Sequence, residues 1–223
     1  MSPYLTASLE RAVIQPNRRA LLQIALIAPF ALPYRARAAG AQSTALDPIV
    51  TLNSGLLAVM KAGNAVPFTE RYNTLSRVVE NTFDLQEILR RCVGSSWSTL
   101  AAPEQAELLE VFQRFTITSY IASFNSYAGQ RFEIEPSPRA VGSDVVVETH
   151  LVPLNGEPSR LDYMMHLQGN KWRVVDVLLD GTISRVAVQR SDFRRFLAGH
   201  DPSGLISSMQ QKIASLSDKS VRS

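Results

Sequence analysis

Apolar side chains recur every three or four residues through the first half of the chain beyond residue 46, which is the spacing of one helix face. The pattern predicts four helices, over residues 48–62, 67–82, 85–93 and 103–128. Asp47 and Pro48 favour the start of the first helix, and Gly63 favours its end. Asp84 is a candidate cap for the third helix, and Gly129 is expected to close the fourth.

The second half of the chain changes to shorter runs rich in β-branched residues, which are typical of strands. Three main strands are predicted over residues 145–152, 160–167 and 171–178, with an outer strand over 132–135 and a short strand or loop over 182–188. The pairs Gly169–Asn170 and Asp180–Gly181 predict turns. Helical spacing then returns over residues 191–197 and 202–216.

This order of elements predicts a single α+β domain over residues 42–216, in which helices cover one face of a curved antiparallel sheet. The chain has 223 residues, a length that suits one domain. We find no internal repeat and no linker long enough to divide it. Residues 217–223 are polar and are expected to form a disordered tail.

The first 41 residues follow the order of an export signal. The pair Arg18–Arg19 precedes a 13-residue apolar run that ends at Leu32, and small residues suited to signal peptidase follow as far as Ala41. The run is too short to span a bilayer, so residues 1–41 are predicted to be a signal peptide, with an N-terminal membrane anchor as the alternative. The surroundings of the arginine pair also resemble a twin-arginine signal, and the sequence leaves the export route open.

The net charge of +3 and the pI of about 9.2 belong mostly to this segment. Residues 1–41 contain five arginines and one glutamate, which leaves 18 basic and 19 acidic residues in the rest of the chain. A nearly neutral remainder has no basic surplus for a phosphate backbone, so we exclude nucleic acid as a partner. The mature protein is expected in a bacterial periplasm.

Few residues are candidates for catalysis or metal binding. The histidines lack the spacing of a zinc site, and His150 and His166 are expected to form a cross-strand polar pair instead. Cys92 is predicted to be a buried apolar side chain. We therefore predict no metal and no cofactor. The enzymatic alternative is a general base at Asp162 or Asp176, in a dry mouth where burial would raise its pKa; a carboxylate that stabilises a turn is the competing interpretation.

Large apolar residues are abundant on the inward faces of the predicted elements. They would form either the wall of a ligand cavity or the solid core of a structural interaction module, and the pattern alone does not separate the two. The candidate lining residues on the helices are Leu85, Ile88, Leu89, Val93, Leu108, Phe112, Phe115 and Phe124. Those on the strands are Val145, Val147, Leu151, Tyr163, Met165, Trp172 and Val174.

Several segments together resemble the MlaC (toluene-tolerance) family. In chain order they are Phe112–Phe115, Tyr127–Gln130, Gly169–Val177, Leu179–Ser184 and Arg190–Phe193. The segment Leu179–Ser184 is more similar to the hopanoid-biosynthesis-associated (HpnM-like) branch of that family. The resemblance extends over about residues 45–216, and it depends on the order and spacing of motifs that are each weak alone.

The resemblance implies an NTF2-like α+β fold whose apolar cavity holds the acyl chains of a lipid, with the head group near solvent. It implies a soluble periplasmic carrier without catalytic residues, which maintains the lipid asymmetry of the outer membrane. Phospholipid or a hopanoid-type lipid would be the cargo. The implied partners are an inner-membrane ABC transporter complex and an outer-membrane lipoprotein and porin complex. The alternative function is an NTF2-like enzyme that acts on an isoprenoid or steroid-like substrate.

The sequence does not assign the residues that contact the lipid head group. Arg71, Arg77, Arg90 and Arg173 are candidates, with nothing in the pattern to choose among them.

Overall fold

A computed structural model of the chain describes residues 44–198 and 201–222. The predicted signal peptide, residues 1–41, and His200 lie outside these ranges. The helices are α1 (Asp47–Ala62), α2 (Phe68–Thr82), α3 (Leu85–Val93), α4 (Ala102–Ser123), α5 (Arg185–Leu197) and α6 (Ser203–Arg222). The strands are β1 (Arg131–Ile134), β2 (Arg139–Val141), β3 (Asp144–Val152), β4 (Ser159–Gln168), β5 (Lys171–Leu179) and β6 (Ile183–Ser184). This confirms the predicted α+β class.

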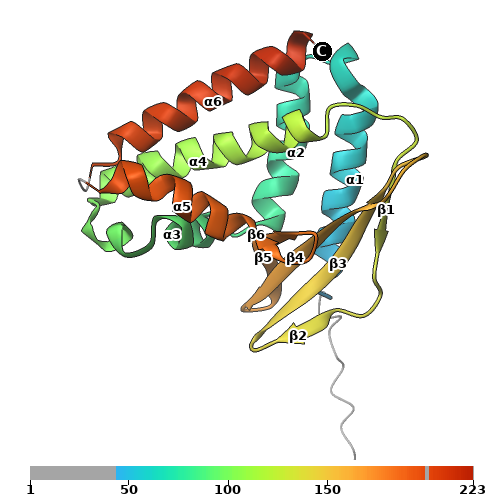
Figure 1. Ribbon diagram of the computed structural model, residues 1–223, viewed down its shortest axis with the longest axis horizontal. Coiled ribbons are helices and arrows are strands. Elements are labelled where there is room, and N and C mark those ends of the chain that lie inside the picture. Colours follow the sequence, from blue (N-terminus) through green and yellow to red (C-terminus); the bar gives the residue numbers. More distant parts are fainter. Residues whose placement is uncertain (1–43, 199–200, 223) are drawn as a thin grey trace, which may run out of the picture. The chain divides into compact units, whose positions relative to one another are not determined.

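The six strands form one antiparallel sheet in the order β1-β3-β4-β5-β6, with β2 paired to the other end of β3 (Figure 1). Side chains alternate between the two faces of a sheet, and the register places Val147, Tyr163 and Val177 side by side on one face. Helices α2, α3 and α5 contact β5, while α1 contacts β1. The apolar core lies between these helices and the sheet.

The first three helices begin and end where their local signals predict. Helix α1 starts at Asp47 with Pro48 in its first turn, and it stops before Gly63, whose φ of +51° favours glycine. Helix α3 is capped by the Asp84 carboxylate, which accepts a hydrogen bond from the backbone N–H of Glu87 at 3.0 Å. Signals within a few residues of the helix ends therefore predict these boundaries correctly.

Helix α4 ends at Ser123, several residues before the predicted stop at Gly129. Phe124 leaves helical geometry, with φ −118° and ψ 53°. Its ring stacks on Tyr120 and contacts Phe132 of β1, with ring centres 6.0 Å apart in both pairs. Packing between α4 and the sheet thus ends the helix earlier than the sequence signal does.

Helix α5 begins at Arg185, inside the segment that was predicted to be a short strand or loop. The Ser184 hydroxyl accepts a hydrogen bond from the N–H of Ala187 at 2.9 Å, and the Asp176 carboxylate accepts one from the N–H of Val186 at 3.1 Å. These two caps outweigh the strand preference of the β-branched residues that follow.

The last helix continues to Arg222, so its predicted end at Leu216 is too early and residues 217–222 are helical instead of a disordered tail. No glycine or proline interrupts this segment, and the Ser217 hydroxyl donates to the carbonyl of Ile213 at 2.8 Å. Among the described helices, none combines the length and the apolar character needed to cross a membrane.

Candidate functional site

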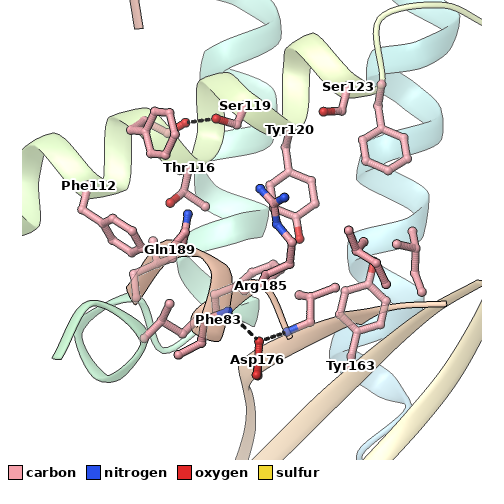
Figure 2. Close-up of a pocket in the computed structure, with 18 residues that line it drawn as sticks. Phe83, Phe112, Thr116, Ser119, Tyr120, Ser123, Tyr163, Asp176, Arg185 and Gln189 are labelled. Carbon is pink, nitrogen blue, oxygen red and sulfur yellow. Dashed lines mark hydrogen bonds between the residues drawn. The ribbon is translucent and has the colours of Figure 1, made fainter. Parts of the chain in front are cut away.

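A cavity of about 300 Å³ lies between α4, the start of α5 and strands β4 and β5 (Figure 2). Its size is at the lower end of the range of ~300–1,000 Å³ for small-molecule sites. Aromatic and aliphatic side chains form most of its wall. The lining residues are Phe83, Leu85, Ile88, Phe112, Phe115, Thr116, Ser119, Tyr120, Ser123, Phe124, Leu161, Tyr163, Asp176, Val177, Leu179, Arg185, Val186 and Gln189.

The structure brings six of the fifteen predicted lining residues together around this cavity. They are Leu85, Ile88, Phe112, Phe115, Phe124 and Tyr163. The other nine belong to the packed core or lie against it, outside the cavity wall: Leu89, Val93, Leu108, Val145, Val147, Leu151, Met165, Trp172 and Val174. Periodicity identifies inward-facing positions, but it does not say where packing leaves space. That the six residues contact a ligand stays a prediction.

Sequence reasoning missed the polar part of the wall. Thr116, Ser119 and Ser123 line the cavity from one face of α4, and Arg185 and Gln189 line it from α5 (Figure 2). The hydroxyl residues recur at helical spacing, which is a signal that a search for apolar residues alone overlooks. The four arginines considered for the lipid head group do not line this cavity.

A second hollow of about 410 Å³ lies between α4 and α6. Phe115, Ser119 and Ser123 line both spaces, so the two hollows adjoin along this face of α4. On the α6 side, the Lys212 ammonium lies 5.8 Å from the centre of the Phe115 ring. A shift of α6 against α4 would therefore change the size of the second hollow, beside the α4 residues that also line the cavity.

Asp176 lies at the edge of the cavity and holds the start of α5 against β5. Its Oδ1 accepts hydrogen bonds from the N–H groups of Val177 at 2.7 Å and Val186 at 3.1 Å, and its Oδ2 accepts one from the Ser184 hydroxyl. Three donors therefore occupy the carboxylate. This arrangement matches a carboxylate that stabilises a turn and a helix start, and it does not suit a general base.

Asp162 is fully buried, but it lies away from the cavity. Its neighbours Leu161 and Tyr163 line the cavity, so alternation along β4 places Asp162 on the opposite face of the sheet. Arg160 donates to both of its carboxylate oxygens at 2.8 and 2.7 Å, and it also pairs with Glu148 at 2.6 Å. Neither Asp162 nor the Asp176 cap is placed as the enzymatic alternative requires.

The predicted cross-strand pair of His150 and His166 does not form. The register places His150 opposite Arg160, whereas the Nδ1 of His166 lies 2.6 Å from a carboxylate oxygen of Asp144. The described residues contain no group of three or more histidine, cysteine or acidic side chains that could hold a metal ion.

A thiol and two tyrosine hydroxyls near the cavity stay uncharged at neutral pH. Burial, reinforced by the negative charge of Asp176, raises the pKa of the Cys92 thiol to about 12, so the thiol is no nucleophile. It donates to the side-chain carbonyl of Gln189 at 3.5 Å. Burial likewise raises the pKa of the Tyr120 and Tyr163 hydroxyls above the usual value, and Tyr163 raises the pKa of Tyr120 further. Both tyrosines are therefore neutral hydrogen-bond donors.

The family model of the MlaC protein matches residues 51–211, most of the part of the chain that folds around this cavity. The chain belongs to the MlaC family. This confirms the resemblance seen in the sequence, while membership of the hopanoid-associated branch stays a prediction.

The MlaC fold of this chain is also similar to a solved structure, that of the phospholipid-binding protein from Ralstonia solanacearum in complex with a phospholipid. The two share 21% sequence identity with a TM-score of 0.67, over 78% of this chain and 99% of that chain. At this identity the likeness shows a common fold. Among curated proteins, no significant match to this MlaC chain is found.

Proposed function

We propose that this protein is a lipid carrier and not an enzyme. It binds a phospholipid or a hopanoid-type lipid in the cavity and carries it through the bacterial periplasm as the soluble component of an ABC transport system. The observation that supports this most strongly is an apolar cavity between the helices and the sheet in a member of the MlaC family. The Ralstonia solanacearum protein, which has this fold, binds a phospholipid in its solved structure.

The physical chemistry of lipids explains why a carrier is needed. A diacyl lipid has on the order of 30 methylene groups, and exposing each one to water costs ~0.8 kcal/mol. Free diffusion across an aqueous compartment is therefore negligible. An apolar protein cavity and a bilayer are both oily, so transfer between them changes the free energy little. Loading and release therefore depend on partners, which we propose to be an inner-membrane ABC transporter complex and an outer-membrane lipoprotein and porin complex.

The size of the cavity indicates that it must widen around a whole lipid. A water molecule occupies ~30 Å³ in the liquid, and a methylene group takes a similar volume. A cavity of 300 Å³ therefore holds only about 10 methylenes. The hollow between α4 and α6 adjoins the cavity at Phe115, Ser119 and Ser123. We therefore place the expansion between these two helices, which open against each other when lipid enters.

The test is whether lipid accompanies the protein and leaves when the wall is altered. The full chain, expressed with export and purified gently, should carry lipid in native mass spectrometry and after solvent extraction. Phe115→Arg puts a charge into the cavity wall and should lower lipid occupancy at least ~10-fold.

Phe68→Arg is the matched control, because Phe68 is also half-buried but lies away from the cavity. It should keep its lipid. Folded wild-type protein that is free of lipid after several gentle preparations would refute the carrier function. Equal occupancy in the two variants would show that this cavity is not the lipid site.

A further inference from the structure

The cavity wall presents hydrogen-bond donors that have no acceptor among the residues that the structure describes. Arg185 lines the cavity yet is exposed, so its guanidinium lies where the cavity meets solvent. Figure 2 shows it extending from the start of α5 toward Tyr120 on α4, and its positive charge acts on that tyrosine. Within residues 44–198 and 201–222, none of the ion pairs or side-chain hydrogen bonds involves the Arg185 guanidinium.

Gln189 adds a second donor one helical turn further along α5. Its side-chain carbonyl accepts from the Cys92 thiol at 3.5 Å, which turns the amide NH2 away from Cys92. In Figure 2 this nitrogen lies toward Thr116 across the cavity. The NH2 group has no acceptor in the part of the chain that the structure describes. Because Arg185 and Gln189 are four residues apart, both donors lie on the same face of the helix.

Two hydroxyls deeper in the wall are also without partners. The Tyr163 hydroxyl and the Thr116 Oγ1 are buried and form no hydrogen bond with any described residue. Buried polar atoms are nearly always bonded in folded proteins, so such exceptions call for an explanation. Tyr163 has no exposed surface, its hydroxyl is neutral because burial raises its pKa, and it lines the cavity. An acceptor carried by a ligand would satisfy it.

The one anionic acceptor of the wall, in contrast, is already used. The Asp176 carboxylate receives the three hydrogen bonds that hold α5. Ser119 directs its hydroxyl to the carbonyl of Phe115 at 2.7 Å. Among the described residues, the wall thus presents one unpaired cation and several unpaired donors but no unpaired anion, which suits a ligand that carries an anionic group and neutral acceptors.

We propose that this donor set selects a phospholipid, with Arg185 and Gln189 binding its phosphate where the cavity meets solvent. Tyr163 and Thr116 then donate to the ester carbonyls below the phosphate, and the acyl chains fill the apolar remainder. This inference rests on the proposed function, that the cavity holds a lipid. It decides between the two cargo classes, because a polycyclic hydrocarbon without a phosphate leaves Arg185 unpaired and the buried hydroxyls unbonded.

The test compares two lipids with the same acyl chains, phosphatidylglycerol and diacylglycerol, which differ in the phosphate and its glycerol. The wild-type full chain should bind phosphatidylglycerol at least ~10-fold more tightly, as expected for charge-assisted hydrogen bonds. Arg185→Gln should remove this preference by weakening phosphatidylglycerol binding alone, and Arg185→Lys should keep part of it. The control is Arg194→Gln, an exposed arginine of the same helix that does not line the cavity.

Each outcome has a separate meaning. Equal wild-type affinity for the two lipids, or an unchanged preference in Arg185→Gln, overturns the assignment of Arg185 while leaving the lipid-carrier function intact. If the wild-type protein binds neither lipid, the proposed function itself fails. If inorganic phosphate binds in an Arg185-dependent manner and lipid does not, the group is a phosphate site and the inference is wrong. The unfolding midpoint of lipid-free Arg185→Gln should equal that of the wild type, because Arg185 makes no bond within the described protein.

Discussion

The two ends of the helical layer contain similar apolar residues, but one end is tightly packed and the other surrounds a cavity. Where α1 packs on α2, Leu52, Leu56 and Leu75 have no exposed surface and fill the interior. Where α4 and α5 approach β4 and β5, half-buried rings such as Phe115 surround open space. Unpartnered polar atoms occur in both regions, at Asn53 in the packed one and at Tyr163 in the hollow one. In the hollow region these atoms border space that a ligand can fill. Apolar residues are common to both regions, so unpartnered polar atoms beside open space mark the cavity better than hydrophobicity does.

The largest expected effect comes from truncating one apolar side chain in each region. Leu52→Ala removes a fully buried side chain from the packed region and should lower the free energy of unfolding by about 2–5 kcal/mol. Phe115→Ala enlarges an existing space and should cost only about 1–2 kcal/mol. Urea unfolding of lipid-free protein measures both. Similar losses for the two variants would mean that the α4 end is packed as tightly as the α1 end.

The second-largest effect on unfolding stability is expected at Asp176, whose carboxylate caps α5 from β5 and so positions one wall of the cavity. Asp176→Asn weakens the acceptor of two backbone N–H groups and one hydroxyl, which should cost about 1–2 kcal/mol in urea unfolding. Asp192→Asn, an exposed change on the same helix, is the control and should be nearly neutral. If Asp176→Asn were as stable as the control, the carboxylate would not hold α5, and the enzymatic interpretation of Asp176 would have to be reconsidered.

A smaller effect, with opposite signs in two measurements, is expected at Tyr163. Tyr163→Phe removes a hydroxyl that has no partner in the lipid-free protein, so unfolding stability should stay the same or rise by up to ~1 kcal/mol. The same change should weaken phospholipid binding about 5- to 10-fold, because a donor to the ligand is lost. Tyr72→Phe, on the packed side, should leave binding unchanged. Weaker unfolding stability together with normal binding would contradict the proposed role.

The smallest effect concerns pH and the α3 helix that borders the cavity. Hydrogen bonds from Arg90 and Arg91 hold the pKa of Glu87 at about 2, well below its usual 4.5. Its stabilisation is therefore complete above about pH 4.5 and is lost as the pH falls through about 2. Arg90 is exposed and Arg91 is partly exposed, so solvent screens both pairs and the contribution should be below ~1 kcal/mol.

The measurement for Glu87 is urea unfolding at several pH values. The stability difference between wild type and Glu87→Gln should shrink between about pH 6 and pH 3. A difference that does not change over this range would show that the ion pairs contribute nothing to the stability of α3.

The sequence was a good guide wherever a boundary depends on neighbouring residues. The Asp84 cap of α3 and the Gly63 end of α1 were predicted correctly because their chemistry is complete within four or five positions. The end of α4 was wrong because Phe124 packs on Phe132 of another element. The start of α5 was wrong because its second cap, Asp176, lies on β5, ten residues before Val186, from whose N–H it accepts a hydrogen bond. Contacts of this kind are visible only after the chain has folded.

The same division applies to the site. By itself the sequence determined the α+β class and most helices and strands, because periodicity and caps reflect local backbone bonding. The order of its motifs also indicated the MlaC family. Tertiary structure alone decided which apolar residues surround space and that Arg185, among the arginines of residues 44–198 and 201–222, is the one that lines it. A cavity is the small difference between the volume that the helices and sheet enclose and the volume that their side chains fill. That difference depends on how the elements pack together, which no local pattern records.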